Sequence, residues 1–108
     1  MPLTHNFNDT VRERAARDPA FRAALFSEAM TALLAADLDT AKVAMRAYIN
    51  ATIGFAVLAK ATGTPPKSLM RMFGPNGNPT AANLLGVIGV LQKKTGVRLE
   101  VRATASAA

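Results

Sequence analysis

The segment over residues 65–73, PPKSLMRMF, carries two basic side chains at a spacing suited to reading DNA. Lys67 and Arg71 are four residues apart, so a helix places them on one face. On that face Arg71 can pair with a guanine edge, and Lys67 can pair with a base or a phosphate. A helix of this size, with its outer face exposed, fits a major groove about 12 Å wide. The same two residues also suit the solvated face of an ordinary helical hairpin, which is the alternative interpretation.

The flanking residues have the spacing of a helix-turn-helix, the arrangement that presents such a face. Ala59 supplies the small residue needed where two helices cross, and Gly63, four positions later, supplies the glycine of the turn. Leu69 and Met72 are spaced to anchor the second helix from its inner side, and Leu58 completes the buried set. The residues left to face outward are Pro66, Lys67, Met70 and Arg71.

The residues expected to contact double-stranded DNA run from the end of the first helix of this pair to the loop after the second. They are Lys60, Thr64, Pro66, Lys67, Ser68, Met70, Arg71, Asn76, Asn78 and Thr80. The loop over residues 74–80, GPNGNPT, is of a kind that is most often only a turn. It also brings the start of the last helix beside the basic helix, where free N–H groups can hold a phosphate. It is not a nucleotide-binding P-loop, because no Gly-Lys-Ser/Thr follows.

Capping residues and prolines divide the first half of the chain into helices. A short polar helix is expected over residues 8–16, and Asp18 with Pro19 starts a second helix that stops near Asp37. Asp39 is expected to cap a third helix, which reaches the next candidate cap, Thr52. The apolar residues expected to face the core from the second and third helices are Phe21, Leu25, Ala29, Ala32, Leu33, Val43, Ala47 and Tyr48.

Caps, prolines and glycines also divide the second half of the chain into helices. A helix over residues 53–62 ends at Gly63 in the left-handed conformation, and Thr64 is expected to cap the short basic helix, with two prolines in its first turn. Thr80 caps the last helix, whose buried face would hold Leu84, Val87, Ile88 and Leu91. Gly86 and Gly89 inside that helix each cost about 1 kcal/mol relative to alanine. Close helix packing would offset this cost, and a plain loss of stability is the alternative.

The segment after the last helix, VRLEVR at residues 97–102, alternates apolar and charged side chains and predicts a half-buried strand. The chain offers no second convincing strand, so pairing with the same strand of a second copy would satisfy its backbone groups. Such a homodimer would read a palindromic operator. Pairing with residues 3–7 would instead leave a monomer. The expected fold is therefore mostly α, a helical bundle containing a helix-turn-helix, with a short C-terminal β-strand paired across a dimer.

The charge of the chain and its distribution indicate the class of partner. The chain has 108 residues, enough for one domain, and a net charge of +6. We divide it into an N-terminal helical segment (1–38), a helix-turn-helix domain with its strand (39–103) and a tail (104–108). Residues 1–39 carry four basic and six acidic side chains, whereas residues 40–108 carry nine basic side chains and one acid. A region with so large an excess of positive charge attracts polyanions, so nucleic acid is the expected partner. A basic surface without such a ligand is the alternative.

Little in the sequence indicates catalysis. The chain has no cysteine, and its one histidine, His5, is isolated. Asp37 and Asp39 are close together, but capping explains both. We therefore expect no enzymatic activity, no metal site and no cofactor. The longest apolar run, residues 84–91, is too short to span a membrane, and the first ten residues lack a signal pattern, so we expect a cytoplasmic protein with no membrane partner.

Residues 39–103 resemble the small helix-turn-helix proteins known as addiction-module antidote, or HigA-like, antitoxins. The matching motifs are Leu-Ala-x-x-x-Gly at 58–63, Ser-Leu at 68–69, Gly-Asn-Pro at 77–79 and Gly-Val-Arg-Leu at 96–99. The chain departs from the family pattern at Pro65, where many relatives carry serine. The resemblance implies a DNA-binding antitoxin of a type II toxin-antitoxin module, which represses its own operon and pairs with a RelE-like, RNA-cleaving toxin.

Two other functions fit the same residues. One is a helix-turn-helix transcriptional regulator without a toxin partner, and the other is a basic RNA-associated protein. RNA binding would favour aromatic side chains interleaved with basic ones, and Tyr48, Phe55 and Phe73 are few and expected to be buried. If a toxin exists, we expect it to contact the N-terminal half, because the acidic balance of that half complements a basic partner.

Overall fold

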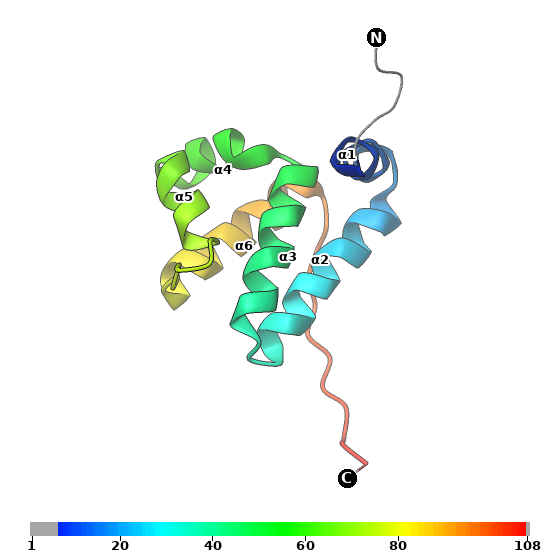
Figure 1. Cartoon of the computed structure of the whole chain (residues 1–108). Coiled ribbons are helices and arrows are strands. Elements are labelled where there is room, and N and C mark those ends of the chain that lie inside the picture. Colours follow the sequence, from blue (N-terminus) through cyan, green and yellow to red (C-terminus); the bar gives the residue numbers. More distant parts are fainter. Residues whose placement is uncertain (1–6, 108) are drawn as a thin grey trace.

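The computed structural model describes residues 7–107, and within them the chain forms six helices and no strand. They are α1 (Phe7–Arg17), α2 (Pro19–Leu34), α3 (Leu38–Ala51), α4 (Gly54–Thr62), α5 (Pro66–Met72) and α6 (Ala81–Thr95). Figure 1 shows α3 at the centre, with α1 and α2 on one side and α4, α5 and α6 on the other. The predicted helical bundle is confirmed. Within the described residues, no helix combines the length and apolarity that crossing a membrane requires.

Two helix starts agree with the sequence prediction because their signals are local. Asp18 accepts the N–H of Phe21 at 3.1 Å through Oδ1 and caps α2. Thr80 accepts the N–H of Asn83 at 3.1 Å through Oγ1 and caps α6. In each case the capping side chain satisfies an N–H group that the first helical turn leaves without an intrahelical partner.

The predicted cap of α3 is wrong. Asp37, not Asp39, caps this helix, and its Oδ1 accepts the N–H of Thr40 at 3.2 Å. Ala36 adopts the left-handed conformation, with φ of 62°, so the chain reverses within the short link after α2 and the helix starts two residues early. Asp39 therefore lies in the first turn, where a carboxylate favours the positive end of the helix dipole.

The predicted N-caps of α4 and α5, Thr52 and Thr64, are also wrong. The Thr52 hydroxyl donates to the carbonyl of Tyr48 at 2.7 Å, so it ends α3 rather than starting α4. Thr64 is not a cap either, because Pro65 takes that position with φ of −58° and ψ of 144°. The physical reason is Pro66, whose ring disfavours the helical conformation in the residue before it.

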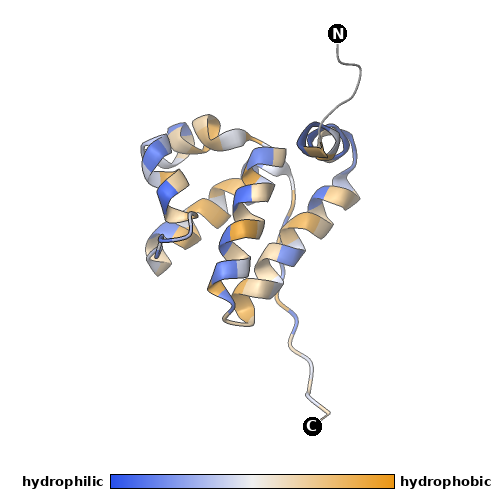
Figure 2. Cartoon of the chain, in the orientation of Figure 1, coloured by the Kyte–Doolittle hydropathy of each residue, from blue (hydrophilic) through white to orange (hydrophobic). Residues whose placement is uncertain are grey.

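The core joins both halves of the chain. Phe26 of α2 stacks on Tyr48 of α3 with ring centroids 4.4 Å apart, and the Tyr48 hydroxyl donates to Thr95 Oγ1 of α6 at 2.7 Å. Burial raises the pKa of Tyr48. Figure 2 shows hydrophobic residues along α2, α3, α4 and α6, whereas α1 is mostly hydrophilic. The cluster consists of Phe26, Ala29, Met45, Tyr48, Ile49, Phe55, Leu58, Ala59, Leu69, Phe73, Val87, Ile88, Leu91 and Val97.

The predicted inner face of α3 is only partly right. Tyr48 is buried, but Val43 is 57 % exposed and Ala47 is exposed. Met45 and Ile49 point inward instead. The helix is covered on more than one side, by α1, α2 and α4, so its buried stripe is wider than the spacing of the bulky residues alone indicates.

Two arginines join helix C-termini that are distant in sequence. Arg22 of α2 donates from Nε to the carbonyl of Thr95 at 3.1 Å and from its terminal nitrogen to the carbonyl of Ala15 at 2.7 Å. Arg12 of α1 donates to the carbonyl of Asn50 at 3.2 Å. These guanidinium groups satisfy carbonyls at the ends of α1, α3 and α6, where cations favour the negative end of the dipole.

The C-terminal segment is not in a strand within the described residues. Val97 is buried, Leu99 is partly buried, and the Leu99 N–H donates to Gln92 Oε1 at 3.0 Å. Val101 is 83 % exposed. Of the alternating apolar residues, Val97 and Leu99 thus pack against the core of the same chain, and Val101 does not. In the alternative pairing partner at residues 3–7, Phe7 belongs to α1, and the rest, with His5, lies outside the described residues.

The part of the chain that the structure describes does not provide the close packing expected at the α6 glycines. A Cβ built on Gly86 or Gly89 would find no atom within 4 Å beyond the helix's own backbone. Gly86 is exposed and Gly89 is partly buried. Among residues 7–107, no packing contact therefore offsets the helix-propensity cost of either glycine.

Candidate nucleic-acid interface

The site is built on the paired helices α4 and α5. Leu58 and Ala59 of α4 and Leu69 of α5 are buried, as the sequence pattern predicts, and Met72 is partly buried. Gly63 closes α4 with φ of 73°, and its N–H donates to the carbonyl of Ala59 at 2.9 Å. A residue with a side chain rarely adopts this conformation, so glycine is what permits the tight turn.

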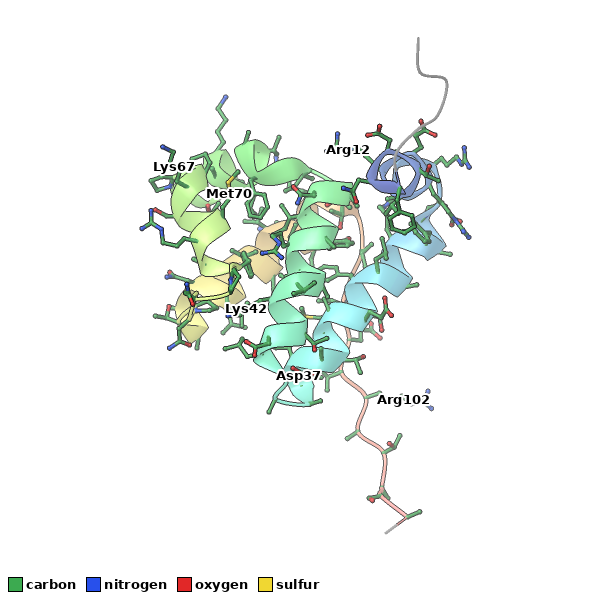
Figure 3. All side chains as sticks on the ribbon, in the orientation of Figure 1. Arg12, Asp37, Lys42, Lys67, Met70 and Arg102 are labelled. Atoms are coloured by element: carbon green, nitrogen blue, oxygen red, sulfur yellow. The ribbon has the colours of Figure 1, made fainter. Side chains whose placement is uncertain are left out.

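The outer face of α5 is open to solvent. Pro66, Lys67 and Arg71 are exposed, and Met70 is 49 % exposed. In Figure 3, Lys67 lies at the edge of the molecule farthest from α2, and Met70 lies on the side of α5 that faces α3. The division between buried and outward-facing residues of α5 therefore matches the sequence prediction.

Several of the predicted contact residues gather in one groove between α5 and α6. The groove has a volume of about 380 Å³ and is lined by hydroxyl, amide and guanidinium side chains together with Met72, Gly77 and Pro79. The predicted residues that it brings together are Thr64, Ser68, Arg71, Asn76, Asn78 and Thr80. Lys60, Pro66 and Lys67 do not line it; all three are exposed, with Lys60 on α4 and the other two on α5.

A second groove, of about 510 Å³, lies on the other side of Arg71 and contains residues that sequence reasoning missed. Arg46 and Asn50 of α3 line it together with Met70, Arg71 and Asn76. Arg46 and Asn50 are four residues apart on one helix, which is the available sequence signal. That signal does not show that α3 lies beside α5, because the two segments are separated along the chain and meet only in the folded protein.

Some of the positive charge counted from the sequence is used inside the protein. Lys42 is buried and donates from Nζ to the carbonyls of Gly77 at 2.7 Å and Pro75 at 3.3 Å. Arg46 donates to the carbonyl of Phe73 at 3.2 Å. Figure 3 shows Lys42 on α3, on the side of the loop that follows α5. The fully exposed cations of this region are therefore fewer than the sequence count indicates.

The described residues contain no group of three or more metal-ligating side chains. Of the two neighbouring carboxylates near α3, Asp37 has its pKa lowered by hydrogen bonds from the side chain and N–H of Thr40. A carboxylate that is held ionised in this way acts as a helix cap, and a lowered pKa is the opposite of what a general acid needs.

Comparison of the chain with protein-family models, with curated proteins and with solved structures finds no match.

Proposed function

We propose that this chain is a sequence-specific DNA-binding repressor that acts as the antitoxin of a type II toxin-antitoxin module. The observation that carries the DNA-binding part is the division of α5 into an inner side held by Leu69 and an outer side that presents Lys67, Met70 and Arg71. A short helix supported from behind, with basic residues on its free face, suits insertion into the major groove.

The side chains of α5 suit different features of a DNA duplex. Arg71 can donate two parallel hydrogen bonds to a guanine edge, and Met70 can contact the methyl group of thymine. Lys67 is one turn before Arg71 and suits a phosphate. Arg46 and Asn50, in the groove beside Arg71, extend the surface towards the DNA backbone on the α3 side. Thr80 and the start of α6 extend it on the other side.

The DNA-binding proposal is tested by gel shifts over several salt concentrations, with duplexes that the wild-type protein selects from a randomised pool. Arg71→Ala should weaken binding to the selected duplex by about 1–3 kcal/mol and relax its specificity. Lys67→Ala should weaken binding to all duplexes and reduce the salt slope by about one. Lys93→Ala is the matched control, because Lys93 is exposed in the last turn of α6, far from α5 in the chain.

Equal affinity of the wild type and the Lys67/Arg71 double alanine variant for the selected duplex would rule out α5 as the recognition helix. Selective binding of single-stranded RNA over duplex DNA would favour an RNA-associated protein instead.

The antitoxin part rests on the family resemblance and on the charge balance of the N-terminal half. Glu28 of α2 is exposed on the side of the molecule formed by α2 and α3. Removing the N-terminal helices is not a usable test, because Phe26 and Ala29 belong to the shared core. Glu28→Arg should instead weaken neutralisation of a basic toxin encoded beside this gene while DNA affinity stays unchanged. If no such toxin is encoded there, the regulator without a toxin partner is favoured.

The dimer part concerns residues 97–102. In an extended segment, alternate N–H groups point to opposite edges. Because the Leu99 N–H is bonded to Gln92, the edge available for a second copy is the one formed by Arg98, Glu100 and Arg102. An antiparallel two-fold pairing along that edge would also cover Val101, which is 83 % exposed.

Proline at position 100 tests this pairing, because it removes an N–H of the available edge and leaves the Leu99 bond in place. We expect Glu100→Pro to lower the dimer fraction measured by light scattering. Glu100→Ala is the control for loss of the carboxylate, which lies 3.8 Å from Arg98 within the chain. A wild-type monomer, or a fully dimeric proline variant, would show that this segment is not the interface.

A further inference from the structure

The loop between α5 and α6 is held by two cations of α3. The Lys42 side chain is 6 % exposed, and its ammonium bonds to the carbonyls of Pro75 and Gly77. One turn further along α3, Arg46 bonds to the carbonyl of Phe73. The carbonyls of alternate residues 73, 75 and 77 are thus all directed to α3, while the side chains of Asn76 and Asn78 are exposed.

Gly77 fixes the same loop against the end of α5. Its N–H donates to the carbonyl of Gly74 at 3.0 Å. A Cβ at this position would lie 2.6 Å from the carbonyl carbon of Met72 and closer still to the carbonyl oxygens of Met72 and Arg71. Only glycine permits this approach, so the loop is constrained by α3 on one side and by α5 on the other.

The held loop forms one surface with the outer face of α5. Asn76 and Arg71 each line both grooves that flank α5, and Asn78 lines the groove on the α6 side. Asparagine amides can form paired hydrogen bonds with the major-groove edge of adenine. A contact made from a fixed loop loses less conformational entropy on binding than one made from a free loop.

We propose that Lys42 is a positioning residue for DNA recognition, which holds the 74–80 loop so that Asn76 and Asn78 form a second reading element beside α5. This inference rests on the proposed DNA-binding function. Lys42 acts through the loop and does not itself touch DNA, because its ammonium is buried and is directed to two protein carbonyls and to the Asp39 carboxylate at 3.7 Å.

If Lys42 positions the loop, its loss should change DNA affinity and salt dependence differently from the loss of a lysine that binds phosphate. Loss of a phosphate contact lowers affinity for every duplex and reduces the salt slope. Loss of Lys42 should lower affinity for the selected duplex alone, because the misplaced groups are those that read bases. Non-specific affinity and the salt slope should remain those of the wild type.

The test uses the full chain and the duplex that the wild-type protein selects from a randomised pool, with a scrambled duplex of equal length for comparison. We expect Lys42→Met to reduce affinity for the selected duplex by about ten-fold, the equivalent of one base contact. In a background that already carries Asn76→Ala and Asn78→Ala, the same substitution should have no further effect. Lys93→Met serves as the control for loss of one positive charge.

A merely structural role would give an equal loss in both backgrounds, and a direct phosphate contact would lower the salt slope by about one; either result overturns the proposal. A DNA-free measurement separates this outcome from failure of the proposed function. Hydrogen exchange of the Gly77 N–H should be faster in Lys42→Met, while the α2 amides keep their protection. Unchanged exchange at Gly77 would show that Lys42 does not hold the 74–80 loop, even if the wild type binds no DNA.

Discussion

Gly86 is a position where alanine should stabilise the protein through the helix backbone alone. It lies in the interior of α6, it is exposed, and an added Cβ would find open space. Its φ is not in the left-handed region, so no strain opposes the change. The remaining effect is helix propensity, which favours alanine over glycine by about 0.8–1.0 kcal/mol. We expect Gly86→Ala to increase the free energy of unfolding by that amount and to raise Tm by about 4 °C.

Gly96 provides a matched control in the same region. Its added Cβ would also find open space, but it ends α6 with φ of 69°. Gly96→Ala therefore differs from Gly86→Ala in backbone conformation rather than in crowding, and it should destabilise the protein by about 1 kcal/mol or more. Urea unfolding followed by far-ultraviolet circular dichroism measures both effects, with the m-value expected to stay constant.

A Gly86→Ala variant that is no more stable than the wild type would refute the reasoning from propensity and open space. A loss of stability that grows with protein concentration would have a specific meaning, because it would show that a second copy packs on this face of α6 and that the added methyl group disturbs that contact.

Three further predictions concern other parts of the fold. Gly77→Ala should destabilise the protein by about 1–3 kcal/mol, since its Cβ meets backbone of α5, and urea unfolding will measure the loss. Thr95→Val removes the buried partner of the Tyr48 hydroxyl and should cost about 1–3 kcal/mol, whereas Thr95→Ser should retain most of the stability. The carboxyls of Asp18 and Asp37 have pKa values below the ordinary 3.8, because helix N–H groups donate to Asp18 and the side chain and N–H of Thr40 donate to Asp37. The stability that they contribute is present above the unfolded pKa and is lost as pH falls through the folded pKa, so Asn variants should flatten the decline in Tm below about pH 4.

The features predicted correctly from the sequence are those with local causes. Asp18 and Thr80 cap helices through hydrogen bonds to residues three positions later, and Gly63 and Gly96 end helices because they accept positive φ. These signals depend on a few neighbouring residues, so the sequence contains all the necessary information.

The errors arise where several local choices compete and the rest of the fold decides. Asp37 and Asp39 can both cap α3, and the left-handed turn at Ala36 selects the first. Val43 and Met45 are both apolar, and the neighbours of α3 decide that Met45 is buried. Alternation cannot show whether an extended segment finds a partner strand.

The candidate site divides in the same way. The outer residues of α5 follow from helical spacing within a short segment. Arg46 and Asn50 were missed because they come from α3 and approach Arg71 only through the tertiary fold. The hydrogen bonds from Lys42 to two backbone carbonyls could not be predicted either. A count of charges does not distinguish a buried lysine from one that is available to DNA.

The Arg22 contacts have a consequence for the order in which the chain folds during synthesis. The α2 and α3 segments are adjacent and can pair early, but Arg22 cannot complete its hydrogen bonds until Thr95, 73 residues later, has been made. At about 5–20 residues per second, that interval is roughly 4–15 s. During this time Arg22 lacks the Thr95 carbonyl, and the Tyr48 hydroxyl lacks the Thr95 hydroxyl that accepts its hydrogen bond. The nascent N-terminal half therefore exposes an incomplete core, and it becomes native only when the last helix arrives.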